Sequence, residues 1–310
     1  MTDRIMVVED LKKTFKVGFA RKVVEAVRGV SFVVNQGEIF GFLGPNGAGK
    51  TTTMKMLMDL IRPSGGRIEL FGSPPGSIEA RKRIGYLPEQ PYFYDYLKPG
   101  ELVDFFGQLY GVPRAVRRKR VDELLTLVGL DHARDRTLRK FSKGMLQRAG
   151  LAQALIGDPE LVILDEPLSG LDPIGRKELK DIIVALKQRG KTVFFSSHIL
   201  ADIELLCDHL AIVHKGLLKY FGATSEFVLQ GQKEVEIIAS NVSASVKATV
   251  VARALAVEDF GEKMKLLATR ADAAAIVELL VKGGAQVDVV APRSESLEEI
   301  FVRTAQEEGA

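Results

Sequence analysis

The chain has 310 residues, of which 46% are hydrophobic and 27% are charged. This length suggests about two domains, and the composition is that of an ordinary globular protein. The composition excludes disordered, collagen-like and disulfide-scaffold proteins. The net charge of +3 does not by itself predict binding to nucleic acid.

Charge is unevenly spread along the chain. Residues 221–310 hold 9 Lys or Arg and 14 Asp or Glu, a net of −5, so the other 34 basic and 26 acidic residues give residues 1–220 a net of +8. The two parts therefore look like different modules. Cys207 is the single cysteine, which excludes an internal disulfide and favours a reducing compartment. We see no signal peptide and no run of roughly 18 apolar residues, so any membrane role is expected to come from a partner.

Strands and helices alternate along the first 222 residues. Short apolar runs predict the strands, and apolar periodicity between turn signals predicts the helices. In chain order we expect strands at 4–9, 22–34 and 38–43, a helix at 49–61, strands at 67–71 and 83–87, helices at 99–111, 114–129 and 142–158, a strand at 161–164, a helix at 174–189, a strand at 191–196, a helix at 199–206 and a hairpin at 210–221. This alternation predicts a largely parallel sheet covered by helices.

The character of the chain changes after Gly222. The remaining residues contain no cofactor motif that we recognise. We expect strands at 233–240, 263–268 and 286–290, and helices at 271–282 and 296–306. This pattern predicts a small α+β domain.

Residues 44–51 read G-P-N-G-A-G-K-T and fit the P-loop pattern G-x-x-x-x-G-K-[ST]. Its glycines let the backbone turn tightly, so that successive N–H groups reach phosphate oxygens at a helix N-terminus. Lys50 supplies a positive charge for the β- and γ-phosphates, and the hydroxyl of Thr51 suits Mg²⁺. The residues expected to hold ATP in this loop are Gly44, Pro45, Asn46, Gly47, Ala48, Gly49, Lys50, Thr51 and Thr52.

The apolar run LVIL at 161–164 ends in two adjacent carboxylates, Asp165 and Glu166. Carboxylates at the end of a buried strand are costly unless something pairs with them. In a P-loop protein the natural partner of Asp165 is Mg²⁺, and Glu166 is then free to orient the attacking water. The alternative is that both acids simply cap the following turn.

These two motifs and five further segments resemble, in order, the ATP-binding-cassette (ABC) ATPases. Gln90 in YLPEQ resembles the Q-loop glutamine, which senses Mg²⁺ and the attacking water. The segment SGLD at 169–172 resembles the D-loop, and His198 in FFSSHIL resembles the switch histidine at the γ-phosphate. Phe15 in LKKTF resembles the aromatic residue that stacks on adenine, with Phe19 as a competing candidate.

The segment FSKGMLQR at 141–148 resembles the family signature, commonly LSGGQ. Lys143 stands where glycine is usual and Met145 where glutamine is usual, and this form resembles cassettes that serve two-subunit exporters of the ABC-2 type. Ser142 and Gly144 remain, so their hydroxyl and backbone N–H groups are expected to meet a γ-phosphate across a dimer interface. Ser142 also suits an ordinary helix N-cap.

The resemblance implies a P-loop NTPase fold of the α/β class, with a mainly parallel sheet and an antiparallel β portion. The cassette domain is expected at 1–222, with a helical subdomain at about 90–158, followed by a small α+β accessory domain at 223–310. The stretch SLEEIF, ending at Phe301, loosely matches such accessory domains. The resemblance suggests a dimer-stabilising or regulatory role for this domain. The alternative is an appendage that adds stability and has no separate function.

The resemblance also implies ATP and Mg²⁺ as cofactors and ATP hydrolysis as the activity. Glu166, His198 and Gln90 are the expected catalytic residues, and Thr51, Gln90 and Asp165 the expected metal site. Because both halves of a hydrolytic site are present, we expect a homodimer. ATP-driven dimerisation would then drive separate membrane permease subunits from the cytoplasmic face of the membrane.

The aromatic cluster Tyr92, Phe93, Tyr94 and Tyr96 is expected to line a groove for a cytoplasmic helix of the permease, because aromatic residues are enriched at interfaces. The alternative is that half of these rings pack inside the helical subdomain. The basic run RAVRRKR at 114–120 is more consistent with a solvated helix face than with binding to anionic lipid. No nucleic acid is expected as a partner.

Two other functions are alternatives. A soluble mechanical ABC ATPase acting on DNA or ribosomes usually carries a long coiled coil or two tandem cassettes, and this chain has neither. A small-molecule kinase with a P-loop needs no signature or D-loop. An exporter subunit is therefore the leading hypothesis, and the cargo is not encoded in this chain.

Overall fold

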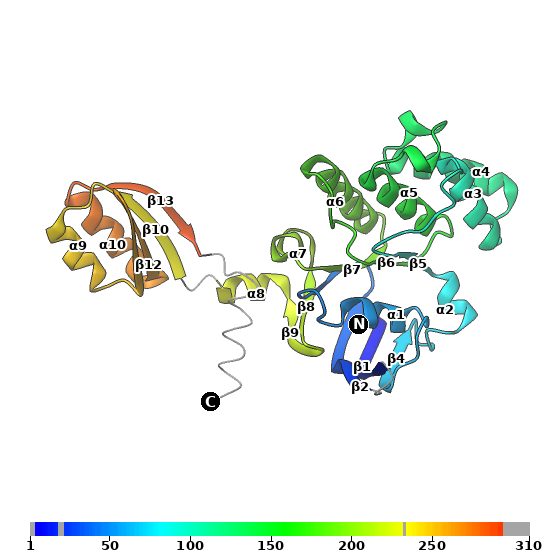
Figure 1. Ribbon diagram of the computed structural model, residues 1–310, viewed down its shortest axis with the longest axis horizontal. Coiled ribbons are helices and arrows are strands. Elements are labelled where there is room, and N and C mark those ends of the chain that lie inside the picture. Colours follow the sequence, from blue (N-terminus) through cyan, green and yellow to red (C-terminus); the bar gives the residue numbers. More distant parts are fainter. Residues whose placement is uncertain (1–3, 18–21, 232–233, 294–310) are drawn as a thin grey trace. The chain divides into compact units, whose positions relative to one another are not determined.

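The computed structural model describes residues 4–17, 22–231 and 234–293 (Figure 1). The chain separates into two compact units between Thr224 and Ser225, close to the expected boundary at 222. Each unit has its own hydrophobic core. The α/β class expected for the first unit is confirmed by its sheets and the helices around them.

A six-stranded sheet forms the centre of the first unit, in the order β5-β6-β7-β3-β8-β9. Its strands are β3 (Ile39–Leu43), β5 (Ile84–Leu87), β6 (Leu161–Leu164), β7 (Thr192–Ser197), β8 (His209–His214) and β9 (Leu217–Ala223). All neighbouring strands are parallel except β8 and β9, which form the expected hairpin. Strands β3, β6 and β7 are buried along their whole length, as is usual for a parallel sheet with both faces covered.

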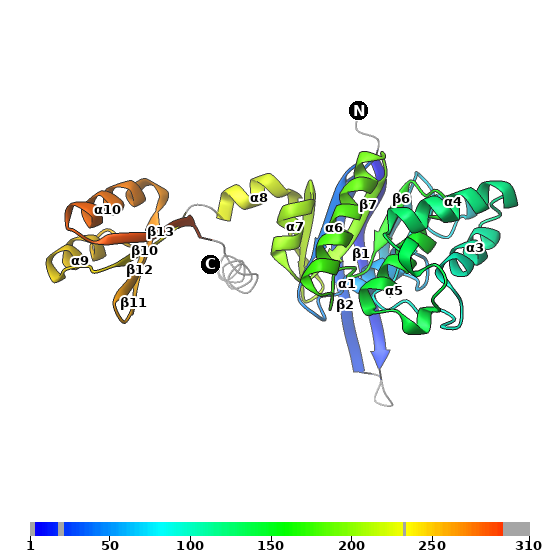
Figure 2. The ribbon, with the colours of Figure 1, turned by 90° about the horizontal axis from the view of Figure 1, so that it is seen from above.

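A second, antiparallel sheet has the order β2-β1-β4. Its strands are β1 (Arg4–Val17), β2 (Lys22–Asn35) and β4 (Gly65–Leu70). Strand β1 is much longer than the expected strand at 4–9, because residues after Asp10 continue to pair with β2 through several bulges. Its polar second half carries little hydrophobic signal, so the pairing with β2 decides its conformation. Figure 2 shows the long hairpin that results.

Seven α-helices lie in the described part of the first unit. They are α1 (Lys50–Leu57), α2 (Ile78–Lys82), α3 (Pro99–Leu109), α4 (Arg114–Leu127), α5 (Lys143–Leu155), α6 (Pro173–Gln188) and α7 (Leu200–Leu206). Helix α8 (Thr224–Gly231) begins at the boundary and lies almost wholly in the second unit. Helices α3, α4 and α5 pack on one another and form the helical subdomain (Figure 1). Helix α1 ends earlier than expected, because Asp59 adopts a left-handed backbone with φ of 53°. Helices α2 and α8 were not predicted.

Aromatic rings join the two sheets in the core of the first unit. Phe32 of β2 stacks on Phe40 of β3 with 5.5 Å between ring centroids, and Phe40 stacks on Phe194 of β7 at the same distance. All three side chains are fully buried. Stacked rings bury large apolar areas in fixed geometry, so they hold the antiparallel sheet against the parallel one.

The carboxyl ends of the parallel strands meet at one edge of the sheet. Strand β3 runs into the P-loop, β6 into Asp165 and Glu166, and β7 into His198. Strand β5 runs into the loop that contains Gln90. Motifs far apart in the sequence therefore come together at this edge, where open α/β sheets usually bind ligands.

From Glu234 to Pro292 the second unit is a four-stranded antiparallel sheet with two helices, and the strand order is β11-β12-β10-β13. Its elements are β10 (Glu234–Ser240), α9 (Ala244–Val251), β11 (Ala256–Phe260), β12 (Lys263–Thr269), α10 (Arg270–Lys282) and β13 (Gln286–Pro292). This βαββαβ arrangement is the ferredoxin-like motif. Neither α9 nor β11 was predicted. The helix expected at 296–306, with the SLEEIF stretch, lies outside the described residues.

Candidate active site

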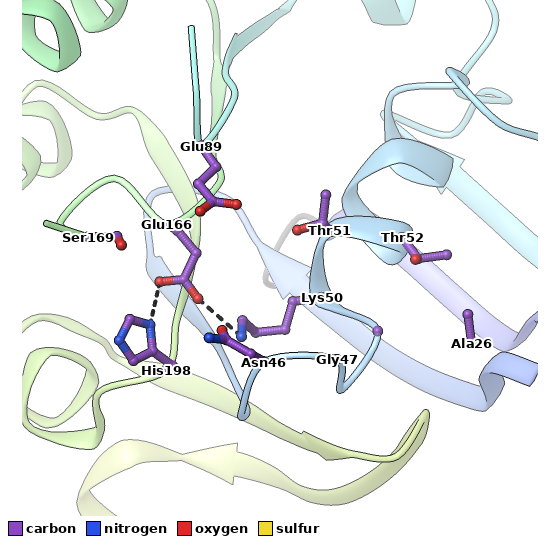
Figure 3. Close-up of a pocket in the computed structure, with 11 residues that line it drawn as sticks. Ala26, Asn46, Gly47, Lys50, Thr51, Thr52, Glu89, Glu166, Ser169 and His198 are labelled. Atoms are coloured by element: carbon purple, nitrogen blue, oxygen red, sulfur yellow. Dashed lines mark hydrogen bonds and ion pairs between the residues drawn. The ribbon is translucent and has the colours of Figure 1, made fainter. Parts of the chain in front are cut away.

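A cavity of about 380 Å³ opens beside the P-loop (Figure 3). It is lined by Ala26, Asn46, Gly47, Gly49, Lys50, Thr51, Thr52, Glu89, Glu166, Ser169 and His198. These residues come from the long hairpin, the P-loop, and the segments after β5, β6 and β7. The structure thus brings together most of the predicted P-loop residues with Glu166 and His198.

Glycine is required in the P-loop for two separate reasons. Gly47 and Gly49 have φ of 81° and 104°, backbone conformations that other residues rarely adopt. A Cβ on Gly49 would also lie only 2.5 Å from the carbonyl oxygen of Ala26. The loop therefore fits closely against β2, and α1 begins directly after it with its N-terminal N–H groups available to an anion.

Lys50 and Glu166 form a buried ion pair. The Nζ atom of Lys50 lies 3.0 Å from Oε1 of Glu166, and the two side chains are only 5% and 9% exposed. Lys50 also donates hydrogen bonds to the carbonyl oxygens of Gly44 at 2.6 Å and Pro45 at 3.2 Å. The phosphates of a nucleotide would have to compete with Glu166 for this ammonium group.

His198 holds the other oxygen of the same carboxylate. Its Nδ1 atom lies 2.8 Å from Oε2 of Glu166 (Figure 3). Glu166 itself has a left-handed backbone with φ of 47°, an uncommon conformation for a glutamate. The backbone N–H of Glu166 donates to Oγ of Ser196 at 2.8 Å. Backbone, lysine and histidine together fix the carboxylate at the mouth of the cavity.

Asp165 is almost fully buried between Ser196 and Thr51. Its Oδ1 atom accepts hydrogen bonds from Oγ of Ser196 at 2.9 Å and from Oγ1 of Thr51 at 3.4 Å. Burial raises the pKa of Asp165, the two hydrogen bonds oppose that rise, and the charges of Glu89 and Glu166 add to it. A hydroxyl beside a buried carboxylate without an ion-pair partner in the described residues is a donor set that fits Mg²⁺.

Replacing this buried charge should stabilise the protein. Because the pKa of Asp165 is raised on folding, its ionised form opposes folding above that pKa. We expect Asp165→Asn to raise the melting temperature at pH 7 without nucleotide, and the gain should shrink as the pH falls through the raised pKa. Thermal unfolding across pH measures this difference.

Asp202 provides the matched control. It is equally buried, but it pairs with Arg176 and, at 2.7 Å, with Lys180. Asp202→Asn should therefore lower the melting temperature, because it leaves two half-buried cations without their buried partner. Equal destabilisation by both substitutions would contradict the interpretation of Asp165.

Other predicted site residues do not line the cavity. Gln90 is exposed and its Oε1 atom accepts a hydrogen bond from the hydroxyl of Tyr92 at 3.3 Å. Phe15 pairs with Val24, two residues before the cavity-lining Ala26, so it lies in the nearby part of the hairpin. The roles of Gln90 and Phe15 stay predictions, and Phe19 lies outside the described residues.

The signature residues also lie apart from this cavity. Ser142 is the N-cap of α5, and its hydroxyl accepts a hydrogen bond from the backbone N–H of Met145 at 3.3 Å. Ser142 is exposed and Gly144 is half-buried. Their role across a dimer interface stays a prediction.

Sequence reasoning missed Ser196 and Glu89. Ser196 connects Asp165 to the backbone of Glu166, and Glu89 projects into the cavity. The two serines before His198 were a usable signal, since small hydroxyl side chains are unusual in a fully buried strand. Glu89 directly precedes Gln90, the residue to which the resemblance points, and the sequence alone gives no signal that separates the two positions.

The comparisons with known proteins agree with this geometry. A family model described as "ABC transporter" matches residues 27–169. An uncharacterized ABC transporter ATP-binding protein of Synechocystis is 42% identical over 303 residues, which are 97% of this chain and 84% of that protein. The chain belongs to the ATP-binding proteins of ABC transporters. The expected family is therefore confirmed.

This ABC ATP-binding protein has further relatives of known name and structure. A fluoroquinolones export ATP-binding protein of Mycobacterium tuberculosis is 41% identical over 215 residues, which cover 68% of this chain and 70% of that one. A solved structure of an ATP-binding subunit of an ABC transporter superposes with a TM-score of 0.64 at 32% identity, covering 73% of this chain and 92% of the other. The chain is thus an ATP-hydrolysing transporter subunit.

No helix in the described ranges is long and apolar enough to cross a membrane. ABC ATP-binding subunits generally work together with membrane permeases.

Two arginines of the basic helix α4 form contacts within the chain. Arg117 pairs with Asp104 at 2.5 Å, and Arg120 donates a hydrogen bond to the carbonyl oxygen of Ile156 at 2.9 Å. Arg117 and Arg120 thus contact the chain itself, whereas Arg114, Arg118 and Lys119 are exposed. The solvated-face interpretation of this run stays a prediction.

Proposed function

We propose that this chain is the ATPase subunit of an exporter and that it hydrolyses Mg·ATP as a homodimer. The observation that carries the proposal is the arrangement of Glu166 between Lys50 and His198 in a cavity formed by the P-loop. The direction of transport is supported by the name of the Mycobacterium relative. The cytoplasmic face of a membrane is the proposed location.

Each residue at the site has a chemical role in this proposal. P-loop N–H groups and Lys50 hold the β- and γ-phosphates, which frees Glu166 from its ion pair with Lys50. Thr51 and Asp165 would hold Mg²⁺, which neutralises charge on the phosphates. Glu166 then accepts a proton from the attacking water, and His198 keeps the carboxylate oriented.

The position of the signature supports a homodimer. Ser142 and Gly144 are at the start of α5 and do not line the chain's own cavity. A second copy would place them over the γ-phosphate, so each ATP would be held by the P-loop of one chain and the signature of the other. Contacts that exist only with the γ-phosphate favour the closed dimer before hydrolysis.

A second cavity supports a docking site for the permease. It has a volume of about 490 Å³ and is lined mainly by aromatic rings and prolines. The lining residues are Tyr86, Pro88, Pro91, Tyr92, Phe93, Phe106, Leu109, Tyr110 and Gln153. Beside it Tyr94 and Tyr96 are 59% and 67% exposed, with 5.8 Å between their ring centroids. A cytoplasmic helix of a permease with bulky apolar residues would suit this surface.

The exposed tyrosines should matter for coupling rather than for hydrolysis. Because they lie outside the ATP cavity, we expect Tyr94→Ala with Tyr96→Ala to leave basal ATPase activity unchanged and to abolish stimulation by the permease. Loss of two aromatic anchors typically weakens binding by about 2 kcal/mol or more. ATPase assays with and without the co-purified permease measure both effects.

Leu60→Ala provides a control for this pair, because Leu60 is an exposed apolar residue outside the aromatic surface. Leu60→Ala should change neither the basal ATPase activity nor its stimulation by the permease. Misfolding of the double tyrosine variant would instead indicate that these rings pack inside the helical subdomain.

The proposal as a whole is tested by a pull-down with Glu166→Gln from the source cells. Membranes are solubilised in mild detergent with ATP and Mg²⁺, and the co-purifying proteins are identified. We expect a polytopic membrane protein. A cytosolic preparation that holds only ribosomes or DNA would contradict the proposal and support a mechanical ATPase.

A further inference from the structure

One buried side chain of helix α5 faces the aromatic cavity without a hydrogen-bond partner. Gln153 is only 7% exposed, and it lines this cavity with residues of β5, of the loop after β5 and of α3. Its side-chain amide forms no hydrogen bond with any other described residue. Native proteins rarely leave a buried amide without hydrogen bonds, so this exception requires a physical reason.

Close packing around α5 fixes the position of Gln153. A Cβ on Gly85 of β5 would lie 2.2 Å from the carbonyl oxygen of Ala154, the residue that follows Gln153. A Cβ on Gly157 would lie 2.9 Å from the ring of Tyr110 at the end of α3. Helices α3 and α5 also pack on each other (Figure 1). The backbone of Gln153 therefore stays at a fixed distance from the cavity.

The other polar groups of the lining are neutral, and two of them already donate hydrogen bonds. The hydroxyl of Tyr110 donates to the carbonyl oxygen of Ile84 at 3.2 Å, and the hydroxyl of Tyr92 donates to Oε1 of Gln90 at 3.3 Å. Burial raises the pKa of Tyr86 to about 12, so its hydroxyl stays protonated. None of the lining residues carries a charge, and Gln153 supplies the only side-chain amide among them.

We propose that Gln153 selects the permease helix that enters this cavity, by hydrogen bonding to a neutral polar side chain on that helix. The inference rests on the proposed docking of a permease. Water in the cavity of the free chain can satisfy the amide, but an entering helix expels that water. The helix must then replace the lost hydrogen bond, because an unpaired buried amide weakens binding. Apolar contacts thus provide affinity, and the amide provides specificity.

The lack of charge in the lining decides which side chain fits. A carboxylate or ammonium group on the helix would lose its water and find no ion-pair partner among the lining residues, which is costly. A wholly apolar helix face would leave Gln153 unpaired. We therefore expect one serine, threonine, asparagine or glutamine within an apolar face of the helix.

Photo-crosslinking identifies the segment that enters the cavity. Leu109 lines the cavity and is 67% exposed, so we place the photoreactive residue p-benzoylphenylalanine at this position. The full chain is mixed with detergent-solubilised membranes of the source cells and irradiated, and the crosslinked peptide is sequenced by mass spectrometry. We expect an apolar segment of a polytopic membrane protein with one Ser, Thr, Asn or Gln. A wholly apolar segment, or one with a charged residue at the crosslink, would overturn the inference.

Leu205 provides the matched position for the crosslinker. It is 69% exposed on α7 and does not line the aromatic cavity. A crosslinker at Leu205 should not capture the peptide that is captured from Leu109. Capture of the same peptide from both positions would show that the contact is not specific to the cavity and would overturn the inference.

The affinity for the permease tests the hydrogen bond itself. The purified permease that contains the crosslinked segment is titrated onto the immobilised full chain, and binding is followed by biolayer interferometry. Gln153→Met keeps the length of the side chain and removes the amide, so we expect binding to weaken by about tenfold. Its melting temperature should not fall, because the amide has no partner to lose in the described chain. Gln108→Met alters an exposed glutamine outside the cavity and should leave binding unchanged.

A change on the permease completes the test. Replacing its one neutral polar residue by leucine should weaken binding to the natural chain and cause no further loss with Gln153→Met, because both changes remove one hydrogen bond. Natural affinity of Gln153→Met, or additive losses from the two changes, would overturn the inference. If Leu109 captures no membrane protein at all, the proposed docking of a permease is itself wrong, and the inference falls with it.

Discussion

Glu166→Gln should reduce ATP hydrolysis by at least about 100-fold, because it removes the proposed general base. The amide keeps the shape of the side chain but cannot accept the proton of the attacking water. It also ends the ion pair with Lys50, while Lys50 keeps its two hydrogen bonds to the P-loop carbonyls. We therefore expect the variant to bind ATP and to accumulate as a closed dimer, which size-exclusion chromatography in ATP and Mg²⁺ would detect.

Glu160→Gln is the matched control for this substitution. Glu160 precedes β6, whereas Glu166 follows it, and Glu160 pairs with Arg83 at 2.6 Å far from the P-loop end. Its replacement should leave hydrolysis unchanged. Hydrolysis by Glu166→Gln within threefold of the natural rate would remove Glu166 from the mechanism.

Lys50→Met should weaken nucleotide binding and destabilise the protein at the same time. Lys50 is the only Lys or Arg among the residues that line the cavity, so loss of its ammonium group should lower ADP affinity roughly 10- to 100-fold. Without nucleotide, the buried carboxylate of Glu166 would lose one of its two partners, which should reduce the free energy of unfolding by up to about 3 kcal/mol. Calorimetric titration and chemical denaturation measure the two effects separately.

Two comparisons make this prediction specific. Lys55→Met alters an exposed lysine on the same helix. It should change neither the affinity for ADP nor the free energy of unfolding. Adding Glu166→Gln to Lys50→Met should restore much of the lost stability, because no buried charge is then left without its partner. A double variant as unstable as Lys50→Met alone would show that the ion pair contributes nothing to the fold.

The P-loop and the strand ending at Asp165 were predictable from sequence because local chemistry determines them. Gly47 and Gly49 are needed for their backbone conformations, and LVIL is apolar because both faces of β6 are covered. The parallel sheet followed from the alternation of strands and helices. The carboxyl ends of the parallel strands β6 and β7 meet at one edge of the sheet, and there the Nδ1 atom of His198 lies 2.8 Å from Oε2 of Glu166.

Features that depend on distant contacts were not predictable in the same way. The second half of β1 is a strand because β2 pairs with it, and nothing in its own polar sequence requires that. The choice between Glu89 and Gln90 depends on which residue Gln147 holds through its carbonyl oxygen. That contact joins positions separated by 58 residues. The motif identifies the loop in the sequence, but packing of the loop against α5 decides that Glu89, and not Gln90, lines the cavity.

The strand order of the second unit has a consequence for how such a domain is gained or lost in evolution. The two central strands of its sheet, β10 and β12, come from different halves of the segment. The edge strand beside β10 is β13, from the second half, and the edge strand beside β12 is β11, from the first half. A gene truncated between the halves would encode β10, α9 and β11, whose two strands are not neighbours in the sheet and cannot pair as they do in the complete unit. Deletions and fusions are therefore expected to fall near Thr224, where the whole unit is kept or removed, and intermediate lengths among relatives should be rare.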